Sequence, residues 1–308
     1  MGSELFSRRI KTDWQLRSRR LGLGERTLVM GVVNITPDSF SDGGLHLDPE
    51  RAADHALRLL DEGADLIDLG AESTRPGSHA GDPNRAAVSA EEEQARLLPV
   101  LESVLAARPE AIVSVDTYKS ATARAAVAAG AEIVNDVSGF CWDAQMAATC
   151  AELRCGVVLM HTRGRPDEWR TQPALPGDAM LTMVHDGLAA SVSLALDAGI
   201  AAEGLVLDPG YGFGKRFDEN YNLLARQGEL LSLARPLLAG VSRKSFLTRT
   251  LSRLIEKKDE RASDDAREAG SIAAMVAAIL QGASIVRVHG VRAAVEAAAI
   301  ADAVLAVR

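Results

Sequence analysis

Apolar residues gather along the chain in eight short runs, each bounded by turn-forming residues. Runs that are apolar throughout, instead of alternating with polar residues, indicate strands that are buried on both faces. The predicted strands cover Leu28–Val33, Leu66–Leu69, Ile112–Val115, Glu132–Asn135, Gly156–Met160, Leu205–Leu207, Pro236–Ala239 and Ser284–Val288.

Stretches rich in alanine and leucine, with a helical period, lie between these runs. Strand and helix therefore alternate, which favours parallel strands joined by right-handed crossovers. Eight such units predict an α/β protein, a single (β/α)8 TIM barrel. The predicted helices cover Pro49–Glu62, Ala90–Ala107, Ala121–Ala129, Ala144–Leu153, Met180–Ala198, Glu219–Leu233, Ser245–Glu256 with Ala266–Gln281, and Val291–Val307.

A doubly wound open sheet would show the same alternation, but its first strand would run into a GxGxxG turn. Here the first strand runs into NITPD, residues 34–38, which favours the barrel. The segments Trp14–Arg17 and Arg20–Gly24 predict a β-hairpin that closes the bottom of the barrel. We therefore divide the chain into an N-terminal extension with the hairpin, residues 1–27, and the barrel, residues 28–308.

Composition narrows the class of protein. With 308 residues, 47% of them hydrophobic, the chain can bury a large core. Its formal charge is −8 and its basic cluster Arg17–Arg20 holds only three basic residues, which argues against nucleic acid as a partner. The first residues lack the apolar run of a signal peptide, and no segment approaches 18 uninterrupted apolar residues, so we expect a cytoplasmic protein with no membrane partner. Three cysteines without CxxC spacing predict buried thiols.

Nearly every predicted strand ends in a polar residue that precedes a turn. In a barrel these residues converge on the C-terminal rim, where barrel enzymes build their sites. Any one of them is either a helix N-cap or a ligand-binding group, since Asp and Asn cap helices readily. Their coincidence at one rim favours a site. The residues are Asn34, Asp68, Asp116, Asn135, His161, Asp208, Arg243, Lys244 and His289.

The residue types indicate the chemistry of the ligand. Asp116, Asn135 and Asp208 together suit a guanidine-like heterocycle with several N–H donors. Basic side chains at the same rim suit an anionic, phosphorylated group, with pairing to a neighbouring carboxylate as the alternative for Arg287. Residues 208–215 are rich in glycine but lack P-loop spacing, which favours close approach of the backbone to a flat ligand. Phe213 and Met160 either sandwich that ring or belong to the core.

Two polar loops follow the first two strands, residues 34–44 (NITPDSFSDGG) and 72–82 (ESTRPGSHAGD). Loops of this composition are either linkers or active-site lids. Their place above a barrel favours lids.

Eight motifs in order resemble the dihydropteroate synthase family: MGVVNITPDSFSDGG, DLIDLGAESTRPGS, VSVDTYK, EIVNDVSG, VLMHTRG, LDPGYGFGK, LLAGVSRKSFL and SIVRVHGV. They span residues 30–291, essentially the whole barrel. The resemblance implies a pterin-binding TIM-barrel transferase of folate biosynthesis, which condenses 6-hydroxymethyl-7,8-dihydropterin diphosphate with 4-aminobenzoate to 7,8-dihydropteroate and diphosphate. It further implies a target of sulfonamides, a homodimer formed through the later helices and assistance by Mg²⁺.

The resemblance also implies residue roles. The pterin would be bound by Asp116, Asn135, Met160, Asp208, Phe213 and Lys244. The diphosphate would be bound by Asn34, Arg287 and His289, with Mg²⁺ on Asn34. The 4-aminobenzoate would be bound by Phe40, Thr74, Arg75, Pro76 and Ser245. The catalytic residues would be Asp42, Arg75, Lys244, Arg287 and His289, with Asp42 stabilising a methylene cation after dissociation of diphosphate.

Two other functions keep the same pterin pocket. A pterin-dependent methyltransferase domain would need no diphosphate site, and Asn34, Arg287 and His289 argue against it. A catalytically silent pterin-binding paralogue would bind without turnover, and the motifs alone leave it open.

Overall fold

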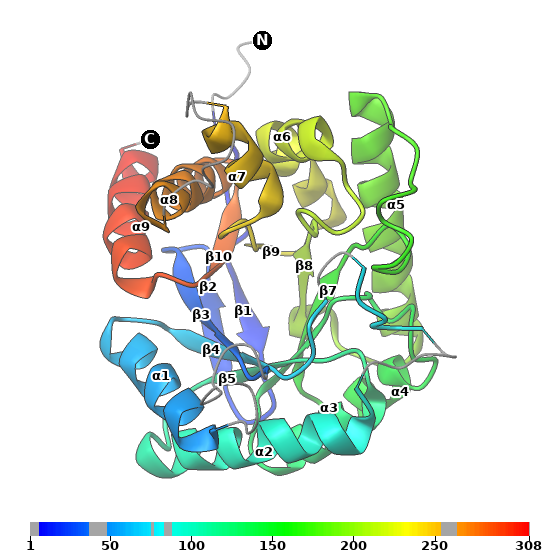
Figure 1. Cartoon of the computed structure of the whole chain (residues 1–308), viewed down its shortest axis with the longest axis vertical. Helices are drawn as coiled ribbons and strands as arrows, with labels where there is room; N and C mark the ends of the chain where they lie inside the picture. The colour runs from blue at the N-terminus through cyan, green and yellow to red at the C-terminus, as the bar shows by residue number, and fades with distance from the viewer. Residues whose placement is uncertain (1–5, 37–47, 75–76, 83–87, 254–263, 308) are drawn as a thin grey trace.

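The computed structural model describes residues 6–36, 48–74, 77–82, 88–253 and 264–307. Eight parallel strands close into a barrel in the order β10-β3-β4-β5-β6-β7-β8-β9, and helices surround them (Figure 1). The predicted TIM barrel with its N-terminal hairpin is confirmed. The strands are β1 Thr12–Gln15, β2 Arg20–Leu23, β3 Leu28–Asn34, β4 Leu66–Gly70, β5 Val113–Asp116, β6 Ile133–Asp136, β7 Gly156–Met160, β8 Leu205–Asp208, β9 Leu237–Ala239 and β10 Ala283–Val288.

The helices follow the barrel strands in turn. Two short 3₁₀ helices, η1 Ala202–Gly204 and η2 Gln227–Leu233, stand among them. The α-helices are α1 Pro49–Asp61, α2 Ala90–Ala107, α3 Ser120–Ala128, α4 Met146–Leu153, α5 Gly177–Asp197, α6 Phe217–Arg226, α7 Ser245–Ser252, α8 Asp264–Leu280 and α9 Val291–Ala306.

The barrel has two separate apolar cores because side chains alternate across each strand. In β4, Ile67 and Leu69 point outward to the helices, where they join the large core between strands and helices. Leu66 points inward and joins a smaller core inside the barrel. Strands buried on both faces in this way need no polar face, which explains why their sequences read as apolar throughout.

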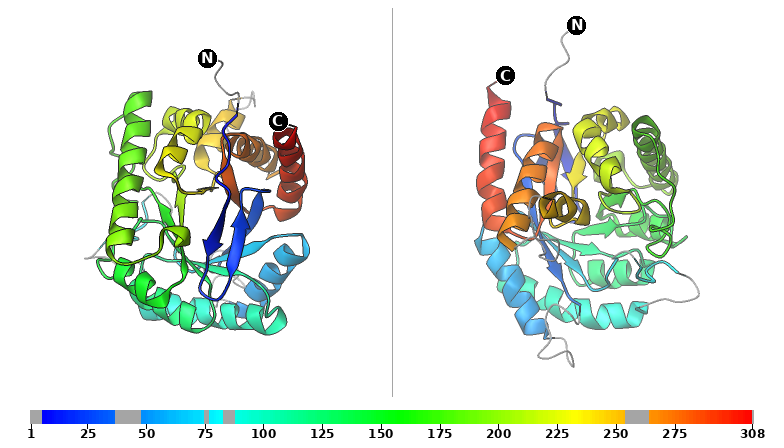
Figure 2. Two further views of the ribbon diagram at one scale, coloured as in Figure 1. Left: turned by 180° about the vertical axis from the view of Figure 1, so that it is seen from behind. Right: turned by 45° about the horizontal axis from the view of Figure 1, so that its top comes forward.

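The hairpin β1–β2 closes the N-terminal end of the barrel. Trp14, Leu16 and Leu23 are buried within the interior core. The indole Nε1 of Trp14 donates to the carbonyl oxygen of Gly204, just before β8, at 2.9 Å. Seen from behind, the hairpin crosses the end of the barrel (Figure 2, left). With this end filled, only the C-terminal ends of the strands remain to face a ligand.

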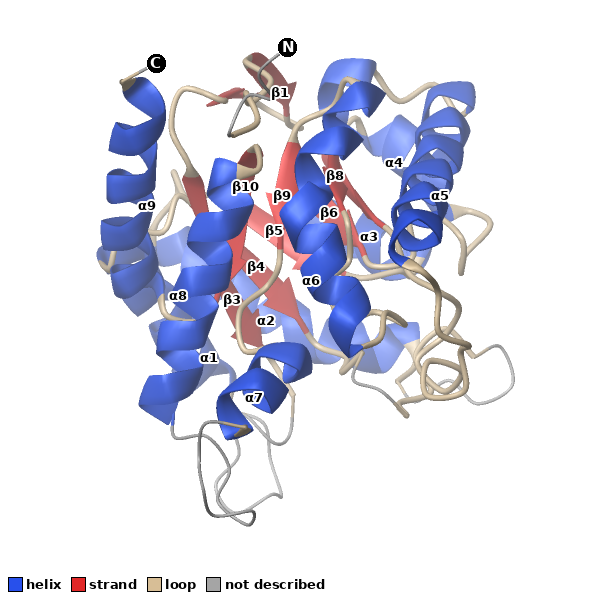
Figure 3. Cartoon of the chain, turned by 90° about the horizontal axis from the view of Figure 1, so that it is seen from above, coloured by secondary structure: helices blue, strands red, loops and turns tan. Residues whose placement is uncertain are grey.

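The first and last parts of the chain are joined. β10 pairs with β3, with Ile285 beside Leu28, and this pairing closes the barrel. Asp302 in α9 accepts from the guanidinium of Arg9 at 2.6 Å and from the backbone N–H of Thr27 at 2.8 Å. The hairpin and the end of α9 lie at one end of the molecule, and α7 lies at the other (Figure 3).

The helix that we predicted over Glu219–Leu233 is shorter in the structure. α6 ends at Arg226 and the chain continues as the 3₁₀ helix η2. Gln227 explains the change, because its side chain is buried and bonds the Tyr211 hydroxyl at 2.7 Å and the Ala278 carbonyl at 3.1 Å. These tertiary contacts override the local helical preference.

The prediction of buried thiols holds for two of the three cysteines. Cys150 and Cys155 are buried, whereas Cys141 is exposed, and all three are free. Cys141 lies in the turn after β6, which lifts it out of the core.

One described helix, α5 over Asp178–Asp197, is long and apolar enough to cross a membrane. It contacts β7 in the helical ring of the barrel, 33% of its apolar window is buried, and one such helix is weak evidence for a membrane span.

Candidate active site

Alternation along the strands places a polar layer directly above the interior core. Leu66, Ile133 and Ile285 belong to that core. Two residues further on, at the same inward-facing phase, come Asp68, Asn135 and Arg287. The same step leads from Val206 to Asp208. The C-terminal end of the barrel therefore carries charged and amide groups where its N-terminal end carries leucine and isoleucine.

Arg287 is the centre of this layer. Its Nε donates to Asp68 Oδ2 at 2.6 Å, and its Nη2 donates to Asp116 Oδ2 at 2.8 Å. The amide of Asn135 donates to the same Asp68 oxygen at 3.1 Å. Asp68 is fully buried, and its other oxygen, Oδ1, has no hydrogen-bond partner. Four strands thus contribute to one network that holds the guanidinium in a fixed plane.

Burial opposes charge in this layer. It raises the pKa of Asp116 to about 7, although Arg287 acts in the opposite direction. Burial also disfavours the charged form of Arg287 and by itself would lower its pKa. The carboxylates of Asp68 and Asp116 outweigh this effect, so the pKa of Arg287 is raised overall. The guanidinium therefore stays charged, and Asp116 is the group most ready to exchange a proton with a ligand.

Asp208 and Lys244 lie on the other side of Arg287. Asp208 Oδ1 accepts from the Gly210 backbone N–H at 2.7 Å, and burial raises the pKa of this carboxyl. Burial lowers the pKa of Lys244 to about 8, with Arg287 as the next cause. Gly240 lies between Asp208 and Arg287, where a Cβ would be in van der Waals contact with both, 3.6 Å from Asp208 Oδ2 and 4.0 Å from Arg287 Cβ.

Aromatic and sulfur-containing side chains border the layer. Met160 is buried, with Phe213 packed against the same small cluster. The ammonium of Lys244 lies 4.0 Å from the centre of the Phe213 ring, and Trp169 packs edge-on against it at 5.1 Å. Lys215 fastens the loop beneath by donating to the carbonyls of His161, Gly210 and Phe213.

His289 follows β10 and is held by Ser242. The hydroxyl of Ser242 lies 3.0 Å from Nδ1 of His289 and accepts from its backbone N–H at 3.3 Å. Burial lowers the pKa of His289 to about 3, and Arg287 adds to the effect. The imidazole is therefore neutral at pH 7 and donates or accepts hydrogen bonds without carrying charge. Asn34, at the end of β3, is half-buried at the same rim.

Comparisons with known proteins agree with this geometry. Residues 30–289 match the family of pterin binding enzymes. The dihydropteroate synthase of Escherichia coli K12 is 40% identical over 280 residues, which are 91% of this chain and 92% of that protein. The dihydropteroate synthase of Bacillus subtilis is 38% identical over 92% of this chain and 91% of its own length.

Solved structures show the same relationship. A dihydropteroate synthase of Xanthomonas albilineans with 4-aminobenzoic acid superposes with a TM-score of 0.83 at 42% identity, over 96% of this chain and all of that one. The same enzyme in complex with 7,8-dihydropteroate gives a TM-score of 0.79 at 40% identity, over the same shares.

The chain belongs to the dihydropteroate synthase family.

Membership of the dihydropteroate synthase family makes this chain a transferase and accounts for its full barrel. The structure brings together Asp116, Asn135, Asp208 and Lys244, which the family resemblance assigns to the pterin, and Arg287, which it assigns to the diphosphate. Their binding roles stay predictions. Thr74 is half-buried in the loop after β4, and Ser245 is exposed at the start of α7, directly after Lys244. Phe40, Asp42, Arg75 and Pro76 lie outside the described residues, so their roles stay predictions.

Sequence reasoning assigned no role to Asp68. We noted it among the strand ends, yet the structure shows that it orients Arg287 and Asn135. The alternation of side chains along β4 could have revealed this role, because Asp68 lies two residues after the inward-facing Leu66 and therefore points into the barrel as well. Asp68 therefore positions two residues for which we predicted binding roles.

Proposed function

We propose that this protein condenses 6-hydroxymethyl-7,8-dihydropterin diphosphate with 4-aminobenzoate, giving 7,8-dihydropteroate and diphosphate. The observation that carries the proposal is the buried layer around Arg287, which presents carboxylate, amide and guanidinium groups from the barrel strands to one rim. The related enzyme from Xanthomonas albilineans in complex with 7,8-dihydropteroate supports the choice of product.

The dihydropterin would be recognised by acceptors from three strands. Its amino group and ring N–H groups match the carboxylates of Asp116 and Asp208, and the amide of Asn135 satisfies a remaining acceptor or donor. Because one oxygen of Asp208 already accepts from Gly210, its second oxygen is the one available to the ligand. Met160 and Phe213 would cover the faces of the ring.

The diphosphate would be bound by Arg287, His289 and Asn34. In the tautomer in which Nδ1 of His289 accepts from the Ser242 hydroxyl, the imidazole proton lies on Nε2, where it can be donated to a phosphate oxygen. Arg287 supplies positive charge that its own carboxylates hold in place. Both groups stabilise charge that grows on the leaving diphosphate, which favours a dissociative displacement.

Mg²⁺ would be bound at this rim mainly by the diphosphate of the substrate. Among the described residues, no group of three or more His, Cys, Asp or Glu side chains could hold a metal. Mg²⁺ takes few protein ligands when it is bound together with substrate phosphates, so the Asn34 carboxamide would hold it alone among the residues discussed. When bound, it supplies neutralisation of diphosphate charge.

The amine substrate would attack after the diphosphate departs. An arylamine is neutral at pH 7 and can lose its proton to water, so the reaction demands no general base from the protein. Thr74 and Ser245 would line the 4-aminobenzoate position. Asp42 would stabilise the methylene cation, and Phe40, Arg75 and Pro76 would complete the pocket, as the family resemblance implies.

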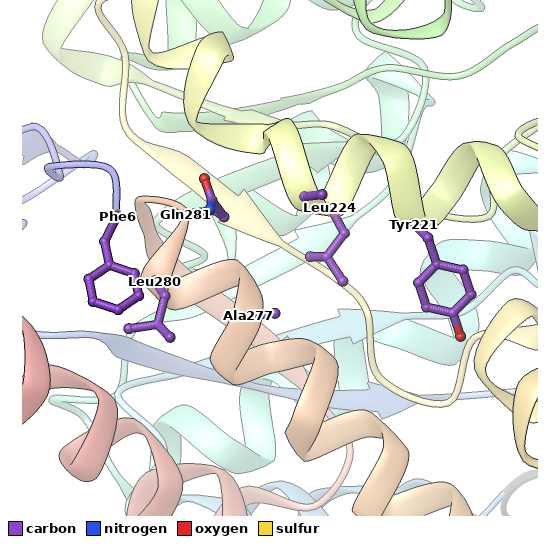
Figure 4. A pocket seen from close by; sticks show the side chains of 7 residues that line it. Phe6, Tyr221, Leu224, Ala277, Leu280 and Gln281 are labelled. Carbon is purple, nitrogen blue, oxygen red and sulfur yellow. The ribbon is translucent and has the colours of Figure 1, made fainter. Parts of the chain in front are cut away.

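We also propose a cytoplasmic homodimer formed through α6 and α8. A hollow of ≈ 330 Å³ between these helices is lined mainly by apolar side chains, among them Phe6, Leu224 and Leu280 (Figure 4). A second copy would bury this surface. Ala277→Arg, placed in the hollow, should convert the dimer to a monomer in light scattering, whereas a monomeric wild-type protein would contradict the proposal.

The decisive experiment follows both products. Purified protein receives the dihydropterin diphosphate and Mg²⁺, with and without 4-aminobenzoate, while released diphosphate and dihydropteroate are measured. Formation of dihydropteroate that depends on both substrates would establish the activity. Binding of the pterin without diphosphate release or product would indicate a catalytically silent paralogue instead.

A further inference from the structure

A second buried charge cluster lies beside the pterin layer. It consists of Lys119, which follows β5; Glu72, in the loop between β4 and α2; and Glu93, in the first turns of α2. The ammonium of Lys119 bonds Glu72 Oε2 directly and lies 3.2 Å from Glu93 Oε2. The exposed fractions of the three side chains are 13%, 4% and 1%. The cluster is therefore a desolvated ion triad, unlike the exposed ion pairs on the helices.

A buried ion triad is weak evidence for stability, because desolvation offsets much of the attraction. Apolar residues would fill the same space at least as well. Such groups are retained where they fix one arrangement among several. The question is which part of the chain this triad fixes.

The two glutamates differ in how they are held. Glu93 Oε2 also accepts from the hydroxyls of Thr122 at 2.7 Å and Thr117 at 3.1 Å, so the scaffold fixes it independently of Lys119. Glu72 is bonded to Lys119 through Oε2 and also forms a side-chain hydrogen bond with the neighbouring Tyr118, while its Oε1 is buried without a hydrogen-bond partner. Lys119 therefore joins a fixed group of the scaffold to a group of the loop.

The rest of the described loop is fastened by other means. Ala80 packs in a small cluster with Tyr118. Gly81 approaches Trp142 so closely that a Cβ there would lie 2.6 Å from the ring. The backbone N–H of Gly77 donates to the carbonyl of Pro166 at 3.0 Å. The late part of the loop thus rests on apolar and backbone contacts. Its beginning rests on the bond of Glu72 to Lys119, with additional bonds from Tyr118 to Glu72 and from Arg96 to the Ala71 carbonyl at 3.1 Å.

We propose that Lys119 is a positioning residue for the 4-aminobenzoate side of the site. Thr74 lies two residues after Glu72 and four residues after the end of β4, so the Glu72–Lys119 bond would fix the path of the backbone that leads from the strand to Thr74. The pterin residues Asp116 and Asp208 belong to strands and do not depend on this bond. The inference rests on the proposed function, and it requires the triad to affect the two substrates unequally.

The test uses Glu72→Gln, which keeps the shape of the side chain and leaves Lys119 paired with Glu93. The KM for 4-aminobenzoate should rise roughly tenfold through loss of one charge-assisted bond, while the KM for the dihydropterin diphosphate stays within about twofold. Amide exchange should quicken in residues 71–74 and stay unchanged in the barrel strands. Lys11→Met is the control, because it removes an exposed lysine that pairs with Glu25. It should change neither the KM values nor the amide exchange of residues 71–74.

A double-mutant cycle compares the wild type, Glu72→Gln, Lys119→Met and the variant that carries both substitutions. If the two residues act as one unit, the double variant should show the 4-aminobenzoate KM of Lys119→Met alone, without a further increase. An unchanged KM for 4-aminobenzoate in Glu72→Gln, or equal rises for both substrates, would overturn the proposal. If the wild-type protein forms no product, the proposed function fails, and amide exchange of Glu72→Gln still decides whether the bond positions the loop.

Discussion

The two ends of the barrel interior are built on the same strands with opposite chemistry. At the N-terminal end Trp14 and Leu66 form a dry apolar core. Two residues further along β4, Asp68 holds the guanidinium of Arg287 in a buried charged layer. One end contributes burial energy and presents no group for chemistry, and the other presents groups whose desolvation costs energy. Substitutions should therefore separate stability from activity according to the end that they touch.

The largest effect is expected at the apolar end. Trp14→Ala leaves a cavity among fully buried side chains and should lower the free energy of unfolding by about 3–5 kcal/mol, with kcat of the folded protein unchanged. Urea denaturation followed by circular dichroism measures this. Trp14→Phe loses the bond to Gly204 but keeps most of the volume, so its loss should be smaller. A Trp14→Ala protein with normal stability and low kcat would contradict the separation.

At the charged end, Arg287→Lys should act mainly on turnover. Lysine has a single ammonium group and cannot bond Asp68 and Asp116 through two nitrogens of one plane, as arginine does. The charge that stabilises the leaving diphosphate would then be poorly positioned, and kcat should drop roughly 100-fold. Initial rates of diphosphate release measure it. Arg124→Lys, in an exposed pair with Glu152, is the matched control and should leave the rate unchanged. An equal loss in both variants would argue against a specific role.

The charged end should also give stability a pH dependence. The pKa of Asp116 rises on folding from 3.8 to about 7. A carboxyl raised in this direction favours folding while protonated, so its contribution is present below about pH 4 and is lost as pH rises through about 7.

Comparison with Asp116→Asn isolates this contribution. Since 18% of the side chain is exposed, we expect the wild-type protein to lose on the order of 2 kcal/mol relative to Asp116→Asn between pH 4 and pH 8. Urea denaturation across that range is the measurement. Parallel curves for the two proteins would show that Asp116 titrates as it does in the unfolded chain.

The smallest effect is expected from Gly240→Ala. The new methyl group would lie 3.6 Å from Asp208 Oδ2 and 4.0 Å from Arg287 Cβ, inside the space that we assign to the pterin. Pterin affinity should weaken roughly fivefold while stability changes by less than about 0.5 kcal/mol. Gly22→Ala in the hairpin, where the nearest atom is 4.0 Å away, is the control. Calorimetric titration with a pterin would decide, and unaltered affinity would place the ligand elsewhere.

Much of the fold could be predicted because its strands are buried on both faces. The run Leu28–Val33 was extended by only one residue in the structure, to Asn34. The helix after β8 could not be delimited in the same way. Gln227 ends it through bonds to Ala278, a partner 51 residues away, and no local pattern reveals such a partner.

In the candidate site, too, local sequence patterns predicted some features, whereas others depend on partners far away in the sequence. Asp116, Asn135 and Asp208 were predicted because each follows an apolar run and carries a polar group. Asp68 looked like another strand end, and its role depends on Arg287, 219 residues away in sequence. The register of a closed barrel brings these two together, and that register is a property of all eight strands. The sequence therefore indicates which residues face the rim more readily than which of them bond each other.

The pairing of β3 with β10 has a consequence for synthesis on the ribosome. β3 is complete at Asn34, but its partner begins at Ala283. At about 5–20 residues per second, the roughly 250 residues between them take on the order of 10–50 s to emerge. Through that interval one edge of β3 has no strand beside it. Asp302, which ties Arg9 and Thr27, emerges later still. β10 also covers the edge of β9, but β9 is synthesised only shortly before it. The nascent chain thus carries an open edge on β3 until β10 leaves the ribosome, and a chaperone that shields this long-lived edge would act on the beginning of the protein.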